Sequence, residues 1–528
     1  TCTVTASLSA NVSSAQIFYR LNNEIEFTSA AMIDTGGGHW SHQFPPSQVT
    51  ISGIQYYIMA RSQTDSILLP EGAPDNLLAH VVVSDDDIPA FELEERVHAM
   101  CGMPARPDLT NMDLLFGALG DYGASRWRYW TTPYDNGSRK YVEHDAAARP
   151  EPGQGFWIVT GSSQNISFAG SSPPLDHPFD FPLEPGWNLI ANPFAFPIPV
   201  GWIILPATAD QVYHHYDSGL TETGSYTTVD TLQPGTGYFV WLGGTQSDNL
   251  SIDIVQRGSG KQASTNTLLA VPADGDFRWK VKIAARAGDR GDGSCIFGQR
   301  EGATSSKDSY DLMKPPHPPG RYIHISLQDG DGYRLMSDWR GATAGGQTWT
   351  MLLASNLLDE TCAIEFVYEG ALPKGWRLVA IENGGLEAVD LLDAALTTRI
   401  ESRAFIRNWR LVAGPEEYIT AALSDAEHDF AREVTVLSLS TAWPNPFQST
   451  IGTTISMSVP GNTTGDLQIF DVRGRLVRTL YSGKLKRGRE SYVWYGKDTA
   501  GQRLASGVYF VRVSTPEARL VRKVMLVR

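Results

Sequence analysis

The chain has 528 residues, 42% of them hydrophobic, which predicts about three to five domains with cores of their own and excludes global disorder. The formal charge of −15 is uneven: residues 441–528 hold 14 Lys and Arg against 5 Asp and Glu, so the remainder carries −24. The basic part has no nucleic-acid-binding motif, so we expect no nucleic-acid partner. Abundant Gly, Pro and aromatic residues indicate short strands separated by turns.

The start of the chain reads as a strand. Residues 1–5 lack the basic region and apolar run of a signal peptide, and no apolar stretch is long enough for a membrane helix. We therefore expect a processed mature start or a fragment of a longer precursor. The four cysteines, Cys2, Cys101, Cys295 and Cys362, fit either two disulfides or four buried thiols. Of the three pairings, Cys295 with Cys362 is predicted, because both lie in one expected domain.

Residues 1–84 are predicted to form one β-sandwich. Residues 15–20 and 53–60 alternate between apolar and polar side chains, as half-buried strands do, and the glycines at 36–38 form a turn. The order of Tyr-Arg, Gly-x-Trp and Tyr-Tyr-Ile in this segment resembles immunoglobulin-like or fibronectin III-like modules of bacterial secreted proteins. The acidic residues 85–87 end the domain as a linker.

Residues 90–258 contain an internal repeat, with copies at about 90–170 and 180–258. Each copy has a strand ending in x-x-Pro, an aromatic strand, and a Pro-Gly-x-Gly turn followed by two aromatic residues, at 152–157 and 234–239. Proline presets the turn and glycine adopts positive φ, so the aromatic residues enter a sheet. Two such units can each bury the open face of the other. The module resembles those of surface and adhesin-like proteins.

Residues 261–430 show many alternating segments at short spacing, which predicts a β-sandwich or jelly roll. Residues 386–396 and 418–430 are the segments expected to form short helices. The predicted fold class of the whole chain is therefore all-β, with several immunoglobulin-like, fibronectin III-like and jelly-roll-like sandwiches in tandem.

Residues 441–528 hold the most specific pattern. The segment opens on Trp-Pro-Asn-Pro-Phe at 443–447, turns at Gly474 and at residues 506–507, and ends in a strand over 520–527. It is very similar to the family that spans the C-terminal type IX secretion sorting domain (type A) and the immunoglobulin-like domain of flagellar hook-capping proteins. The first relationship implies an export signal that is usually removed, and the second implies a retained structural module.

Motifs for catalysis are absent from the sequence: it has no His-Glu-x-x-His and no Gly-x-Ser-x-Gly. Two Asp-Gly turns place Asp289, Asp292, Asp329 and Asp331 as candidate calcium ligands, although neither matches an EF-hand and turn chemistry alone explains them. Apart from calcium, no cofactor is expected, and we predict that the chain is not an enzyme. Six Trp residues in the repeat leave glycan binding as an alternative, at positions 127, 130, 157, 187, 202 and 241.

Together these features predict a secreted protein on the outer surface of a bacterium, with a structural or adhesive role. The acidic body and basic C-terminal domain allow head-to-tail contact between copies, and so an extracellular fibre. The expected partners are other copies or cell-surface components, glycans, and the secretion machinery through residues 441–528. The alternatives are the non-catalytic C-terminal part of a larger secreted hydrolase and an array of carbohydrate-binding modules.

Overall fold

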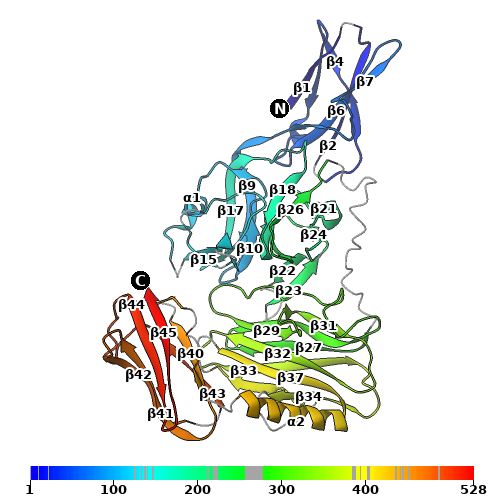
Figure 1. The fold of residues 1–528 in the computed structure, drawn as a ribbon. Helices are drawn as coiled ribbons and strands as arrows, with labels where there is room; N and C mark the ends of the chain where they lie inside the picture. The colour runs from blue at the N-terminus through cyan, green and yellow to red at the C-terminus, as the bar shows by residue number, and fades with distance from the viewer. Residues whose placement is uncertain are drawn as a thin grey trace. The chain divides into compact units, whose positions relative to one another are not determined.

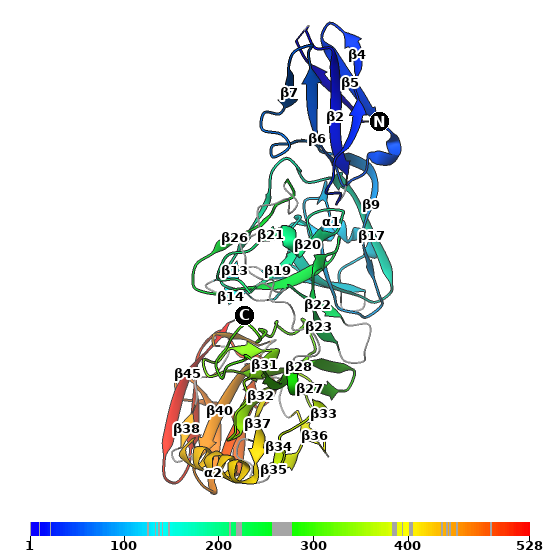
Figure 2. The same cartoon turned by 90° about the vertical axis from the view of Figure 1, so that its right-hand side faces the viewer.

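The structure is a computed structural model. It describes residues 2–527 except 10, 22, 124–125, 133, 136–137, 140, 146–147, 211–212, 218–223, 256–276, 383–387, 393, 401–404, 434–436, 440–441, 443–444, 450–451 and 486–487. The chain divides into two compact units, residues 1–273 with 315–319 and residues 274–314 with 320–528. Its sheets are shown in two views (Figures 1 and 2), and they confirm the predicted all-β class.

The first unit begins with a β-sandwich of two antiparallel sheets, ordered β1-β5-β4 and β3-β2-β6-β7, with β8 added to β6. Alternate residues of β2 and β6, such as Ile17 and Ile58, pair across the strands and point into the core. The strands are β1 (Cys2–Ser7), β2 (Ser14–Leu21), β3 (Thr28–Ala31), β4 (Ile33–Gly36), β5 (His39–Phe44), β6 (Ile54–Arg61), β7 (Ser66–Leu69) and β8 (Leu78–His80), with a 3-10 turn at Pro46–Gln48.

Two sets of sheets with the same strand order follow. The first set has orders β10-β16-β12-β15 and β11-β17-β9, and the second has the equivalent orders β19-β25-β22-β23 and β21-β26-β18. The first copy contains β9 (Val83–Leu93), β10 (Ala99–Gly102), β11 (Arg106–Pro107), α1 (Met112–Leu115), a 3-10 turn at Gly117–Leu119, β12 (Trp127–Thr131), β13 (Tyr134–Asp135), β14 (Ser138–Arg139), β15 (Val142–Glu143), β16 (Gly155–Thr160) and β17 (Gln164–Ser171).

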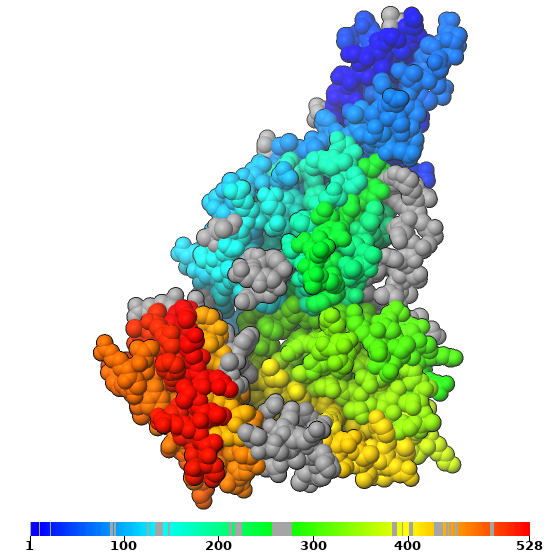
Figure 3. Space-filling model, in the orientation of Figure 1, coloured from blue at the N-terminus to red at the C-terminus, as the bar shows by residue number. Residues whose placement is uncertain are grey.

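The second copy contains β18 (Phe179–Leu183), β19 (Gly186–Ala191), β20 (Ile198–Pro199), a 3-10 turn at Val200–Trp202, β21 (Ile203–Ile204), β22 (Tyr213–Asp217), β23 (Ser225–Val229), β24 (Thr231–Leu232), β25 (Gly237–Leu242) and β26 (Asp248–Ile252). Figure 3 shows the first copy in cyan against the second in green. Their cores are separate clusters, one around Phe116 and Phe156 and one around Phe194 and Val240.

The two copies cross at their Pro-Gly-x-Gly turns through a pair of equivalent hydrogen bonds. The Gly102 amide donates to the Gly235 carbonyl at 3.1 Å, and the amide of Ala191 donates to the Gly153 carbonyl at 2.9 Å. At the centre of the crossing a Cβ on Gly102 would lie 1.9 Å from the Ala191 Cβ. Each copy therefore provides a carbonyl that accepts a hydrogen bond from a backbone amide of the other copy. Position 102 needs glycine because the two backbones approach too closely there for a side chain.

The second unit begins with a sandwich of two sheets, ordered β31-β28-β27-β33-β36 and β30-β29-β32-β37-β34-β35. Trp279, Phe297 and Trp349 meet at its centre. The strands are β27 (Phe277–Ala287), β28 (Arg290–Arg300), β29 (Ile323–Gln328), β30 (Arg334–Leu335), β31 (Ser337–Arg340), β32 (Gln347–Ser355), β33 (Thr361–Gly370), β34 (Trp376–Glu382), β35 (Ala388–Asp390), β36 (Leu396–Arg399) and β37 (Phe405–Pro415).

Helix α2 (Glu416–Glu433) lies along β34 and β37 and buries Ile419 against Val379 and Val412 (Figure 1). This agrees with the helix expected over 418–430. The helix expected over 386–396 is wrong, because Ala388–Asp390 pairs with β34 and strand β36 begins at Leu396. Pairing with the edge strand of a sheet determines the structure of this segment, in place of the helix that the local pattern favours.

The chain ends in a smaller sandwich whose sheets have orders β38-β40-β43 and β39-β45-β44-β41-β42. Its core surrounds Trp494, Tyr509 and Val511. Gly474 has a φ of 77° at the hairpin tip predicted from the sequence. The strands are β38 (Ser438–Leu439), β39 (Phe447–Gln448), β40 (Thr453–Val459), β41 (Thr463–Asp471), β42 (Leu476–Leu485), β43 (Gly488–Trp494), β44 (Gly507–Ser514) and β45 (Arg519–Val527).

Candidate functional site

The four candidate calcium ligands lie in two turns. Asp289 is in the exposed turn before β28, where Arg321 Nη1 lies 3.6 Å from its Oδ1. In the turn after β29, Asp329 Oδ1 accepts the amides of Asp331 and Tyr333 at 3.1 and 2.8 Å. Asp329 therefore closes its own turn, as Asp side chains commonly do. Among the described residues there is no group of three or more His, Cys, Asp and Glu side chains that could hold a metal ion, and calcium at these turns stays a prediction.

Asp292 has a different role, as the centre of a buried polar cluster. Lys314 Nζ lies 2.8 Å from Asp292 and donates to Ser294 Oγ at 2.6 Å, and the Lys314 side chain is 0% exposed. The Ser294 hydroxyl and the Ile325 amide also donate to the Asp292 carboxylate. Burial would raise the pKa of Asp292, but Lys314, His324 and Ser294 outweigh burial and lower it below 3.8. This is a satisfied internal ion pair, and nothing in the sequence marked Lys314 as its partner.

The predicted Cys295–Cys362 disulfide is wrong: all four cysteines are free and buried. Cys295 pairs with Ile283 of β27 from one side, and Cys362 pairs with Ala287 of β27 from the other. Two strand spacings, roughly 10 Å, therefore separate the cysteines, whereas a disulfide needs Cα atoms within about 7 Å. Burial raises the pKa of both thiols to about 12, which keeps them protonated and unreactive.

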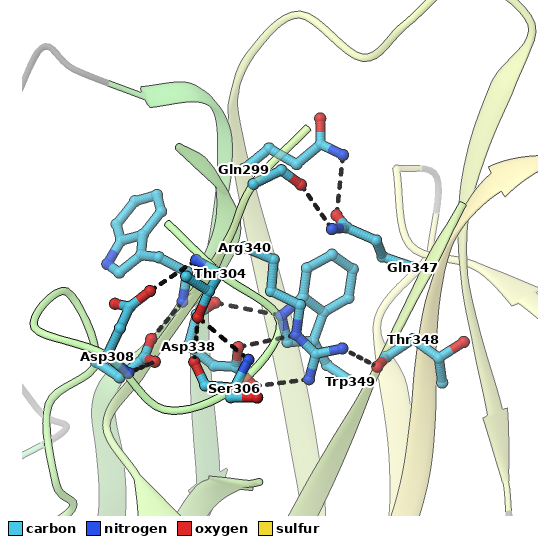
Figure 4. Close-up of polar contacts among 12 residues, drawn as sticks. Gln299, Thr304, Ser306, Asp308, Asp338, Arg340, Gln347, Thr348 and Trp349 are labelled. Atoms are coloured by element: carbon cyan, nitrogen blue, oxygen red, sulfur yellow. Dashed lines mark hydrogen bonds and ion pairs between the residues drawn. The ribbon is translucent and has the colours of Figure 1, made fainter. Parts of the chain in front are cut away.

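A second polar network joins the two sheets of this sandwich at one edge (Figure 4). Gln299 on β28 donates to Gln347 on β32 at 2.9 Å. Arg340 on β31 makes two 3.0 Å bonds to Asp338 and donates to the Thr348 carbonyl at 2.6 Å. These bonds run between backbone and side chains of both sheets. They hold the strands in register, so we assign the network a structural role.

Close to this network, Asp311 anchors the loop between β28 and β29. Its carboxylate accepts the Trp339 amide at 2.7 Å and the Asp308 amide at 2.9 Å. Burial, more than the neighbouring Asp338 and Asp308, raises the pKa of Asp311 to about 7. The loop is therefore held by a carboxyl group that titrates near neutral pH.

Most of the six tryptophans in the repeat belong to its core. Trp127, Trp130, Trp157 and Trp202 are buried. Trp187 and Trp241 are partly exposed, pair across β19 and β25, and contact edge to face with ring centres 5.5 Å apart. These two are therefore the repeat tryptophans that a ligand could reach.

The outer face of the five-stranded C-terminal sheet carries a group of apolar side chains beside polar and basic ones, and we call it the C-terminal sheet face. The register places Leu476, Phe470, Phe510 and Lys523 in one row across β42, β41, β44 and β45. The next row contains Gln468, Arg512 and Val521, and Val508 with Met525 lies beyond Phe510. Leu476 and Val521 are 47% and 46% exposed. A freestanding sheet normally turns polar residues to water, so this face is unusual.

Arg512 lies at the centre of this face. Its guanidinium carbon is 3.9 Å from the centre of the Phe470 ring, and Nη2 donates to Gln468 Oε1 at 2.6 Å. Burial, with Arg519 nearby, lowers the pKa of Arg512 below its usual value, so the cation is partly stripped of water. A stacked cation among apolar side chains is suited to a partner that brings both a carboxylate and apolar surface.

The fold defines a tandem array of β-sandwich domains. Residues 444–518 match the family described as the FlgD Ig-like domain, which confirms the predicted immunoglobulin-like C-terminal domain. None of the curated proteins compared with the chain matches it. In the described ranges, no helix combines the length and apolarity that a membrane crossing requires.

Three solved structures show low similarity. PorZ, an essential surface component of the type-IX secretion system of Porphyromonas gingivalis, is 10% identical with a TM-score of 0.15, over 95% of this chain and 63% of PorZ. A tetra-tandem repeat from a large adhesion protein is 9% identical with a TM-score of 0.14, over 99% of this chain and 95% of the repeat structure. Escherichia coli alpha-2-macroglobulin is 9% identical with a TM-score of 0.14, over 97% of this chain and 33% of the macroglobulin. The chain thus spans less than two thirds of PorZ, and similarity at this level does not define a shared fold.

Proposed function

We propose that the chain is a non-catalytic structural or adhesive protein of the bacterial cell surface, and that its copies associate head to tail into an extracellular fibre. The observation that carries the proposal is the separation of charge along a string of β-sandwiches. Residues 441–528 have a net charge of +9, and the rest of the chain has −24. Opposite charges on different domains of one chain attract between copies, and such contacts can propagate because they do not close.

The proposal is supported by how the polar and ionisable groups are used. Asp292 with Lys314, and Asp338 with Arg340, satisfy each other inside the sandwich. Groups that are engaged with each other in this way support a structural role for the sandwich. The wide sheet surfaces remain as the parts available for contact.

Salt-dependent association tests this function. Sedimentation velocity of the full chain should show large species at about 20 mM salt, and these should dissociate above about 0.5 M because exposed charges are then screened. A chain that stays monomeric at every salt concentration and at high protein concentration contradicts the proposal.

The immunoglobulin-like C-terminal domain is proposed to serve export or surface attachment through type IX machinery. The resemblance of residues 441–528 to the sorting-domain family supports this role. Fused to a periplasmic reporter in a bacterium that has this machinery, these residues should place the reporter outside the outer membrane. A strain without the machinery is the control, and equal export in both strains refutes the role.

Glycan binding by the second repeat is a second candidate function, because Trp187 and Trp241 are partly exposed and adjacent. Aromatic faces of this kind stack on sugar rings. The full chain, Trp187→Ala and Trp241→Ala should be compared on a glycan array, with Tyr333→Ala as the control at an exposed aromatic residue outside the repeat. Loss of a glycan signal in the two Trp variants alone supports this function, and no signal in any protein removes it.

A further inference from the structure

We infer that the C-terminal sheet face is the surface by which one copy binds another, and that it docks on the second repeat of the neighbouring copy. The inference rests on the proposed head-to-tail association and names the two surfaces that form the contact. In this contact, the apolar and cationic face of one copy meets an acidic face of a second, identical copy.

The C-terminal sheet face has the composition of an interface core with a charged rim. Phe470, Phe510 and Val521 supply the apolar centre, around the stacked Arg512. Interfaces commonly centre on aromatic residues and Arg, and desolvated Arg is frequent among the residues that dominate binding energy. Contiguous apolar surface on a sheet that is otherwise complete marks a place where another molecule binds.

Charge around this centre favours an acidic partner. Lys523 lies in the row with Phe510, and Arg519 pairs with Ser514 at the end of β45, where both basic residues are exposed. Asp466 lies on the same face but accepts a hydrogen bond from Ser482 at 2.6 Å. The partner must therefore bring carboxylates to Lys523, Arg519 and Arg512.

The second repeat is the segment of this chain that fits. Its residues 180–256 contain eight Asp and Glu and not one Lys or Arg. Such a long stretch without positive charge gives the segment a net negative charge, which Arg20, bound to the Ile254 and Val255 carbonyls at one end, offsets only there. The other half of the contact therefore lies on the same chain, so no foreign protein is needed.

One face of the second repeat also offers apolar contact. On the sheet β18-β26-β21 the register turns Asp180, Pro182, Asn249, Ser251 and Ile204 away from the buried Leu250 and Ile252. Ile204 is 49% exposed, and Asp180 is exposed in the same row, with Ser251 between them. An exposed apolar residue with a carboxylate in its row is complementary to an apolar centre with a cationic rim.

Paired charge reversals test this contact in the full chain. Arg519→Glu with Lys523→Glu makes the C-terminal sheet face acidic, and Asp180→Lys with Asn249→Lys makes the face of the second repeat basic. Each double variant alone should associate at least tenfold more weakly than the native chain at 50 mM salt. An equimolar mixture of the two should recover association, because each reversed face then meets a face of opposite charge on the other variant.

The control is Lys497→Glu with Arg503→Glu, which changes charge by the same amount in the turn between β43 and β44 rather than on the strands of the face. It should associate like the native chain. Val521→Asp adds a test of the apolar centre and should weaken association at both low and high salt.

The outcomes separate the two proposals. If the native chain never associates, the proposed function fails and the contact fails with it. If the native chain associates but the reversals act no more than the control, assembly stands and this surface is wrong. If the reversals weaken association but the mixture does not recover it, the second repeat is not the partner, and the face binds another acidic molecule.

Discussion

Adding one methyl group at the crossing of the two repeats should destabilise both of them. In Gly102→Ala the new Cβ would lie 1.9 Å from the Ala191 Cβ, where carbon atoms in contact need about 4 Å. Gly102 does not have a positive φ, so the backbone itself tolerates alanine. Overpacking of this kind costs about 1–3 kcal/mol. Separating the strands also strains two hydrogen bonds worth about 1 kcal/mol each, giving roughly 3–5 kcal/mol in all.

Hydrogen exchange followed by mass spectrometry measures this effect locally, because a chain of several domains has no single free energy of unfolding. A change of about 3 kcal/mol corresponds to roughly 100-fold faster exchange in peptides that cover β10 and β19. Peptides from β40 to β45 should not change and act as an internal reference. Gly117→Ala is the matched control, since nothing lies within 4 Å of a Cβ there.

The pseudo-symmetry of the crossing predicts a rescue. Ala191→Gly removes the opposing methyl group, so the double variant with Gly102→Ala should regain most of the lost protection, a coupling of about 2 kcal/mol between adjacent sites. The assigned contact between the repeats is wrong if Gly102→Ala changes the exchange rates in β10 and β19 by less than twofold. It is also wrong if adding Ala191→Gly to Gly102→Ala speeds exchange further instead of restoring protection.

Three further predictions concern the second unit. The pKa of Asp311 is about 7 in the folded state and 3.8 ordinarily. Between these pH values the Asp311 carboxyl group is protonated in the folded protein and ionised in the unfolded chain. Stability of the 301–340 region should therefore fall as pH rises from about 4 to 7 and level off above, by up to roughly 4 kcal/mol, and Asp311→Asn should flatten this dependence in hydrogen exchange. Lys314→Met leaves the Asp292 carboxylate buried without its cationic partner, so it should lower the free energy of unfolding by about 3–5 kcal/mol and speed exchange in β28 and β29. The control Lys374→Met, at an exposed position, should lower it by less than about 0.5 kcal/mol. Thiol titration should find four reactive cysteines after denaturation and almost none before, and a lower number after denaturation would indicate a disulfide.

Features that repeat along the chain were predictable from the sequence. The Pro-Gly-x-Gly turns at 152–155 and 234–237 identify the two copies, because proline and glycine impose the same local geometry wherever they recur. The C-terminal domain was predictable in part for the same reason, since the turn at Gly474 sets the hairpin of β41 and β42, whereas Gly507, also predicted to lie in a turn, is the first residue of β44. Local chemistry decides such elements before any tertiary contact forms.

Pairings between distant strands were not predictable. Cys295 and Cys362 lie in one sandwich, but a single intervening strand, β27, keeps them apart. Asp292 was interpreted from its turn as a cation ligand, whereas the chain brings Lys314 to it from 22 residues away. Spacing along the sequence cannot distinguish these outcomes, because sheet order and register set which side chains meet.

The same limit explains why the C-terminal sheet face was missed. Strand β44 carries apolar residues on both sides: Val511 and Val513 are buried in the core, while Val508 and Phe510 lie on the outer face with Arg512 and Ser514. From the sequence, a strand apolar on both faces predicts a central strand covered on both sides. In the described part of this domain one side is covered by the second sheet and the other is not. The apolar residues on the outer side of β44 therefore favour the inferred contact, and the basic residues around Arg512 favour an acidic partner.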